Sequence, residues 1–226
     1  FTAPNIQASF CKPDRVHQGE ARAADSIMPD DPVAYFVELA EHTKDDGSDY
    51  LVKWLDQKGL DAFLRSHQKP RSGLLQRFVS PVGLRNQLIR VSWTPHHQVV
   101  ETGSNVHGWQ DVSVDLPKRL STFEASHDLC ERGSLSHFRA KDVLNVVDKI
   151  TSHVNALLPS GCSCWSGIFY LKLNPNSELL FLWCSDLQVR NYYEVEPGFV
   201  PRPYNHVDER PTQPYASEKD RRQRIE

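Results

Sequence analysis

KDVLNVVDKITSHVNALLPSGCSCWSGIFYLKLNPNSELLFLWCSDLQV, residues 141–189, is the stretch that decides the fold. Its first part predicts a helix, because apolar residues recur at steps of three and four and form one stripe. The stripe consists of Val143, Val147, Ile150, Val154 and Leu157. Pro159 and Gly161 end the helix. Two apolar runs, residues 167–173 and 179–184, flank an Asn-Pro-Asn-Ser turn, so we expect a β-hairpin packed on this helix.

The part of the chain before residue 80 predicts helices. Asp30 and Asp31 before Pro32 are typical of a helix start, since Asp caps the first turn and Pro fits within it. We expect helices from Asp30 to about Ala40, over residues 48–57, again over 60–66, and briefly over 74–79.

The period then changes to two, which indicates strands. Ile89, Val91 and Trp93 alternate with polar residues. We expect further strands at 98–101, 112–116 and 120–125, with loops at 103–108 and 131–140. Closely spaced strands with short turns pair antiparallel, and one long helix covers one face of such a sheet. The fold class is therefore α+β, with a helical N-terminal part, an antiparallel sheet, a long helix and a C-terminal hairpin.

Composition excludes several classes of function. Twenty-six basic and 29 acidic residues leave a formal net charge of −3, so the chain has no bulk positive field for nucleic acid or an anionic membrane. No apolar run reaches the length that crosses a bilayer, and residues 1–31 contain no signal-peptide core. The odd cysteine number and the absence of an Asn-x-Ser/Thr acceptor favour a reducing compartment. The cysteines are Cys11, Cys130, Cys162, Cys164 and Cys184.

Two terminal segments differ from the domain at residues 30–190. Residues 1–29 are polar and aperiodic, and residues 191–226 are rich in proline and aromatic residues. Such segments order by lying on a partner, with rings that fill pockets and prolines that lower the ordering cost, or by folding back onto the chain's own domain. We expect both to be extended arms, and the C-terminal tail to carry the partner-binding residues. These are Tyr192, Tyr193, Phe199, Tyr204, Tyr215, Arg221, Arg222 and Arg224.

The cysteines suggest two kinds of chemistry, a catalytic nucleophile and a metal site. The Gly-Cys-Ser-Cys-Trp of residues 161–165 is similar to the papain nucleophile motif, but Cys162 replaces the glycine and only His206 follows. Cys162, Cys164 and Cys184 offer three thiolate metal ligands, although zinc sites favour pairs two to four residues apart. We favour a tight turn with buried thiols and expect neither metal nor cofactor.

Other polar residues suggest weaker sites. His96 and His97 are adjacent in sequence and point to opposite faces of any strand, so a solvated turn is the simpler interpretation, and His107 lies near the same sheet. A basic strip with two tryptophans is typical of a surface that binds nucleic acid, but the nearby carboxylates of Glu101, Asp111 and Asp115 reduce its positive charge. This strip would contain Arg85, Arg90, Lys118, Arg119, Trp93 and Trp109.

Two stretches carry a resemblance to a family. GLLQRFVSPVGLRNQLIRVSWTP, residues 73–95, and LWCSDLQVR, residues 182–190, resemble an uncharacterised domain family of ciliary and flagellar proteins from flagellated and ciliated eukaryotes. The resemblance spans residues 73–190 and implies a shared domain in a cytoskeletal setting, without catalytic residues. Residues 104–136 depart from the family pattern, which allows a diverged function.

Together these observations favour a non-enzymatic structural protein whose arms anchor an α+β domain in a large assembly. The resemblance implies an axonemal, doublet-microtubule setting in a cilium or flagellum, within the cytoplasm and cytoskeleton, with tubulin and axonemal proteins as partners. One alternative is a subunit of a mitochondrial or ribosomal assembly, which predicts more Lys and Arg than the chain has. The other is a small enzyme that uses Cys162, Cys164 or His97, which predicts a pocket with convergent polar groups.

Overall fold

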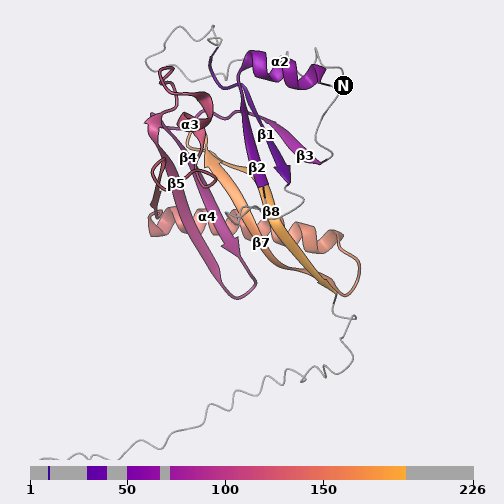
Figure 1. Ribbon diagram of the computed structural model, residues 1–226. Helices are drawn as coiled ribbons and strands as arrows, with labels where there is room; N and C mark the ends of the chain where they lie inside the picture. The colour runs from indigo at the N-terminus through magenta and orange to yellow at the C-terminus, as the bar shows by residue number, and fades with distance from the viewer. Residues whose placement is uncertain (1–9, 11–29, 40–49, 67–71, 192–226) are drawn as a thin grey trace, which may run out of the picture. The chain divides into compact units, whose positions relative to one another are not determined.

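The computed structural model describes residue 10 and residues 30–39, 50–66 and 72–191. These residues form two antiparallel sheets and three helices, which confirms the α+β class (Figure 1). The terminal segments 1–29 and 192–226 lie outside the described residues, apart from Phe10. No helix of the described residues is long and apolar enough to cross a membrane.

The smaller sheet has three strands in the order β2-β1-β3. They are β1 (Ala34–Leu39), β2 (Tyr50–Leu55) and β3 (Gly73–Arg77). Tyr35 of the central strand lies opposite Trp54 on one side and Gln76 on the other. The Tyr35 hydroxyl donates to the Gln76 side chain, which in turn donates to the Leu182 carbonyl at 2.7 Å, so a polar contact joins this sheet to the larger one.

The larger sheet has five strands in the order β6-β5-β4-β7-β8. They are β4 (Arg85–Trp93), β5 (Gln98–Gly108), β6 (Cys130–Gly133), β7 (Cys162–Leu173) and β8 (Leu179–Asn191). The predicted hairpin is confirmed, with both strands longer than the apolar runs that indicated them. β8 forms one edge of this sheet, and the short β6 forms the other.

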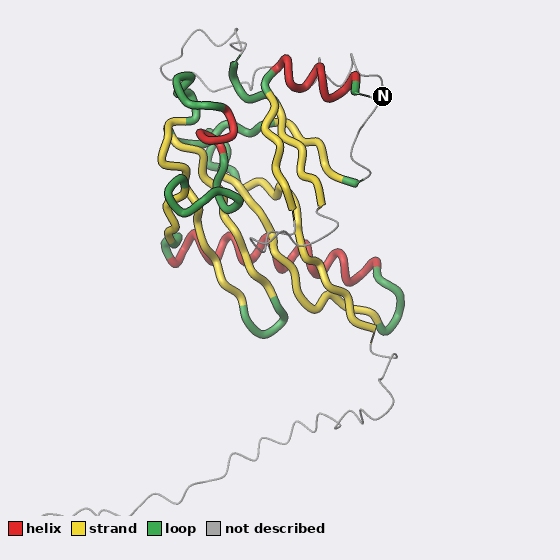
Figure 2. Tube along the Cα trace, viewed as in Figure 1, coloured by secondary structure: helices red, strands yellow, loops and turns green. Residues whose placement is uncertain are grey.

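The long helix α4 (His137–Leu157) packs on one face of the five-stranded sheet, as Figure 2 shows in red behind the yellow strands. Val143 and Val147 of this helix are buried against the sheet, as the stripe predicts. Trp93 Nε1 donates to Asp148 Oδ1 at 3.2 Å, and the backbone N–H of Cys164 donates to Asn155 Oδ1 at 2.7 Å. These bonds fix the helix across the strands.

The three-stranded sheet packs on the opposite face through aromatic side chains. The rings of Tyr170 and Trp183 stack with centroids 4.7 Å apart, and Tyr50 meets Tyr170 edge-on at 5.3 Å. The two faces of the five-stranded sheet pack against different layers because side chains alternate along each strand. Tyr170 faces the small sheet, while its neighbour Phe169 lies in the apolar cluster under α4.

Helix α2 (Gln57–Arg65) covers the outer face of the small sheet. Asp56 caps it by accepting from the Gly59 N–H at 2.6 Å, and Leu60 is its buried residue. The order of layers is therefore α2, three-stranded sheet, five-stranded sheet, α4. The expected helix over residues 60–66 is confirmed, with an earlier start.

The other expected N-terminal helices are wrong, since residues 34–39, 50–55 and 73–77 are strands. β1 is buried on both faces, and a strand of this kind reads as a continuous apolar run without visible alternation. β2 does alternate, since Tyr50, Val52 and Trp54 are buried and Leu51 and Lys53 are exposed. The local helix signals were overridden by pairing between the strands.

The middle of the chain needs four corrections. Residues 111–114 form turns, and Leu116–Leu120 is the short helix α3, so the strand predicted at 112–116 is wrong. Residues 120–125 are also not a strand. The predicted loop at 103–108 continues β5, and the predicted loop at 131–140 holds most of β6 and the start of α4.

Leu157, the last residue of the predicted stripe, is exposed.

Candidate functional site

The structure separates Cys164 from Cys184 along the final hairpin. Cys164 lies opposite Val189, whereas Cys184 lies opposite Phe169. Both side chains belong to the apolar cluster beneath α4. Burial raises the pKa of the Cys164 thiol and raises that of Cys184 to about 12. Both thiols are therefore protonated at neutral pH and are poor nucleophiles and poor metal ligands.

The cysteine set is also not assembled into a ligand cluster. Among the described residues, which include Cys162, Cys164 and Cys184, no group of three His, Cys, Asp or Glu side chains is placed to hold a metal ion. His206, the histidine of the papain-like interpretation, lies outside the described residues. His97 lies in the exposed β4–β5 turn, where its backbone bonds to Thr94.

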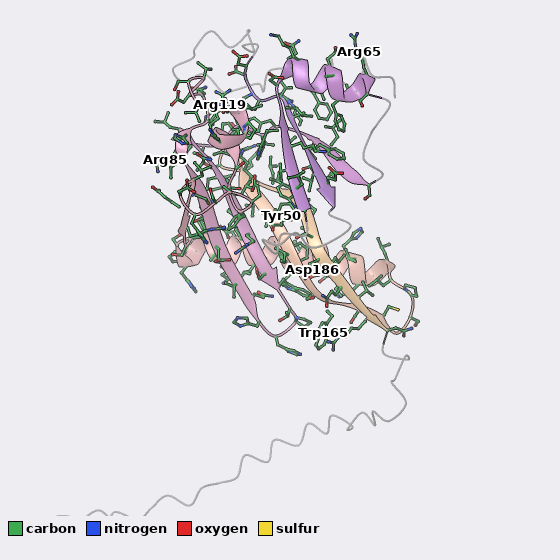
Figure 3. The ribbon with its side chains drawn as sticks, in the orientation of Figure 1. Tyr50, Arg65, Arg85, Arg119, Trp165 and Asp186 are labelled. Atoms are coloured by element: carbon green, nitrogen blue, oxygen red, sulfur yellow. The ribbon has the colours of Figure 1, made fainter. Side chains whose placement is uncertain are left out.

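The predicted basic strip does not exist as one surface. Arg85 pairs with Glu131 at 2.9 Å and Arg90 pairs with Glu101 at 2.7 Å. Arg119 is buried at 2 % exposure, and Trp93 is buried under α4. Figure 3 shows Arg85 and Arg119 on neighbouring elements, yet only Arg85 of these two reaches solvent. These side chains therefore do not form one continuous basic groove.

Buried polar groups between the two sheets were missed by sequence reasoning. Lys172 is 3 % exposed, donates to Asn86 Oδ1 at 2.6 Å and lies over the Phe78 ring. Burial lowers the pKa of its ammonium group to about 7. The signal was visible in the sequence, because a lysine interrupts the apolar run 167–173.

A second buried group is the carboxyl of Glu124. It accepts from the Thr122 hydroxyl at 3.2 Å, and burial raises its pKa, partly offset by Thr122 and the nearby Trp54 indole. Its Oε1 and the Trp54 Nε1 are both buried without a hydrogen bond among the described residues. Arg119 donates from Nη2 to the Asp30 carbonyl, while its Nε and Nη1 have no such partner. These groups belong to the interior of the domain.

The outer edge of β8 is exposed and unpaired among the described residues. All residues from Asp186 to Asn191 are exposed, and Leu187 and Val189 are each 43 % exposed. No described strand lies beyond β8, so its outward N–H and C=O groups form an open sheet edge. Figure 3 labels Asp186 on this edge.

The predicted anchors begin where this edge ends. Tyr192 and Tyr193 follow Asn191 directly in sequence, and all eight predicted partner-binding residues lie outside the described part of the chain. The sequence indicated the strand but not its edge position, because strand order is set by tertiary pairing.

Fold and site together define a layered α+β protein with an open, partly apolar sheet edge, followed in sequence by a segment rich in proline and aromatic residues. Comparison of the chain with protein-family models, with curated proteins and with solved structures finds no match.

Proposed function

We propose that this chain is a non-catalytic subunit of a large assembly, held there by its C-terminal tail. The observation that carries the proposal is that β8 runs along the open edge of the sheet with residues 186–191 exposed. Asn191, the last described residue before the segment rich in proline and aromatic residues, is exposed at the end of this strand. The resemblance of residues 73–95 and 182–190 to ciliary and flagellar proteins supports an axonemal assembly as the setting.

The mechanism that we propose is anchoring by a few residues. Aromatic side chains contribute most of the binding energy in many interfaces when they fill desolvated pockets. Tyr192, Tyr193, Phe199, Tyr204 and Tyr215 take this role. Arg221, Arg222 and Arg224 meet an acidic surface, and a tubulin-like surface fits that requirement.

A catalytic role has less physical support. Cys164, within the stretch that resembles a nucleophile motif, and Cys184, on the paired strand, are kept protonated by burial. Lys172 and Glu124 have shifted pKa values, but Lys172 lies in the core between the sheets and the Oε1 atom of Glu124 is buried without a hydrogen-bond partner among the described residues. Buried groups of this kind affect stability more directly than chemistry.

Co-sedimentation of the full chain with microtubules tests the proposal. One variant replaces the five tail aromatics by alanine, and a second replaces the three tail arginines by glutamate. We expect both to lose most of the bound fraction, the second with a reduced salt dependence. The matched control combines Phe138→Ala and Arg139→Glu, two exposed residues at the start of α4. Sedimentation that is absent for the native chain, or equal in all variants, would contradict the axonemal proposal.

A further inference from the structure

The edge of β8 is not covered by the layers that cover its neighbours. Helix α4 packs chiefly against β7 and β5, and the apolar cluster beneath it is built mainly from β4 and β7. Phe181, Leu187 and Val189 of β8 remain between 42 % and 43 % exposed. Exposed apolar side chains on an open strand edge mark a surface at which another strand can pair.

The sequence at this edge is complementary to itself when it is read antiparallel. In Asp186-Leu187-Gln188-Val189-Arg190, an acidic and a basic residue flank a central glutamine at a distance of two positions. Leucine and valine flank it at a distance of one. A two-fold axis at Gln188 therefore places Asp186 opposite the Arg190 of a second copy, and Leu187 opposite its Val189. Each pair occurs twice, as an isologous interface requires.

The two charges are available for such pairing. Asp186 accepts only from the Gln188 side chain, at 3.2 Å, and neither Asp186 nor Arg190 has an ion-pair partner among the described residues. The Arg190 guanidinium lies 3.5 Å from the centroid of the Trp165 ring, which holds the side chain in place. A held cation loses less side-chain entropy when it meets a carboxylate than a free one does.

A bulge limits the length of the pairing. Ser166 lies opposite Gln188 and Ile168 opposite Ser185, so Asp186 and Leu187 together face Gly167. Asp186 has a φ of 50°, a left-handed conformation that Asp and Asn tolerate. A bulge bends the strand and discourages extended edge pairing, so the match ends at the bulge and does not extend to the residues before Asp186.

We propose that two copies of this chain pair antiparallel through β8, about a two-fold axis at Gln188, and form one continuous ten-stranded sheet. The occupant of the edge is a second copy because the charge pattern and the apolar pattern both match in the same register. This dimer uses only residues of the domain, so the proposal does not depend on what the C-terminal tail binds.

Sedimentation equilibrium of the full chain, over a range of concentrations from the low micromolar upward, tests this pairing. Asp186→Lys and Arg190→Glu each replace two attractive pairs per dimer with two like-charge pairs, so each should weaken the dimer roughly tenfold or more. The double variant D186K/R190E restores opposite charges and should return to within roughly threefold of the native value. An equimolar mixture of the two single variants should form a heterodimer, because their charges are again complementary.

Three controls keep the result interpretable. Asp142→Lys is a charge reversal on the exposed face of α4 and should leave the dimer unchanged. Asp186→Asn removes the charge while tolerating the left-handed φ, and should weaken the dimer less than Asp186→Lys. Circular dichroism confirms that each variant is folded. A native chain that is monomeric at all concentrations, a dimer indifferent to the charge reversals, or a double variant without rescue would each overturn the proposal.

Discussion

The Nζ atom of Lys172 lies 4.4 Å from the centroid of the Phe78 ring, within the core that joins the two sheets. The same atom donates to Asn86 Oδ1, and the Asn86 amide donates to the Leu120 carbonyl. A basic group thus links β7, β4 and α3 in a place where water does not reach it.

Replacing Lys172 by methionine should stabilise the protein at neutral pH. The folded-state pKa of about 7 lies below the ordinary 10.5, so the stability associated with the neutral amine is present above pH 10.5 and is lost as the pH falls to 7. Between pH 10.5 and pH 7 the native chain loses about 4–5 kcal/mol of its free energy of unfolding in this way, and Lys172→Met avoids that loss. The variant leaves the Asn86 acceptor unpaired, which costs about 1–3 kcal/mol, so the net gain in its free energy of unfolding is about 2 kcal/mol at pH 7. Urea unfolding measures this difference between the variant and the native chain.

The free energy of unfolding should also depend on pH differently in Lys172→Met and in the native chain. The native chain should gain stability between pH 7 and pH 10, whereas Lys172→Met should not gain over this range, so that their difference shrinks. Lys149→Met, at an exposed position of α4, is the matched control and should keep the native slope. Parallel slopes for Lys172→Met and the native chain would contradict the buried, neutral lysine.

Replacing Glu124 by glutamine should have the opposite dependence. Burial raises the pKa of this carboxyl, so its contribution is fully present below the unfolded-state pKa and is lost as the pH rises through the folded-state value. Glu124→Gln keeps the shape and carries no charge, so its free energy of unfolding relative to the native chain should increase as the pH rises from 4 to 8. Thermal unfolding across that range measures the trend, with the exposed Glu131→Gln as control. A constant difference would show that the carboxyl ionises without cost.

Buried thiols should resist alkylation in the folded protein. Burial raises the pKa of Cys130, Cys164 and Cys184, the last to about 12, so few thiolates form near pH 8. Iodoacetamide should modify Cys184 roughly a hundredfold or more slowly than free cysteine, until urea unfolds the chain. Mass spectrometry of the peptides assigns the sites. Modification of Cys164 or Cys184 at the rate of free cysteine would revive the cysteine-enzyme hypothesis.

Gly73 should not tolerate a side chain. A Cβ atom there would lie 2.1 Å from Phe36 Cζ and 2.6 Å from the Val37 carbonyl oxygen, and the backbone oxygen cannot move aside cheaply. Gly73→Ala should cost about 1–3 kcal/mol of stability, as overpacked sites do. Gly83→Ala is the matched control, since no heavy atom lies within 4 Å of its Cβ position. Equal denaturation midpoints for the two variants would show that β1 and β3 pack more loosely than described.

The segment from α4 to β8 follows from its sequence. The stripe of α4 and the two apolar runs around the Asn-Pro-Asn-Ser turn are strong signals, because they extend over long segments with one period. The exception in the stripe is Leu157, the last residue of α4, which is exposed.

The strands β1, β2 and β3 and the turns at residues 111–114 do not follow from their sequence. Asp30 and Pro32 give a valid local helix signal, but β1 lies between β2 and β3 and is covered by α2, so its apolar residues serve two faces. Val112 and Val114 alternate like a strand, yet no partner strand is present among the described residues, and the segment forms turns. Alternation without a partner does not make a strand, since the backbone hydrogen bonds must be shared between strands.

The sequence by itself determined the α+β class, the long helix and the hairpin that follows it. It also gave the amino-acid composition of the segment after Asn191, which is rich in proline and aromatic residues. Periodicity and composition are local properties of the chain. Only the tertiary structure decided which strand lies at the edge, which face of each strand is buried, and that Lys172 and Glu124 lose their water. Strand order and desolvation depend on contacts between residues far apart in the chain, and no local pattern encodes them.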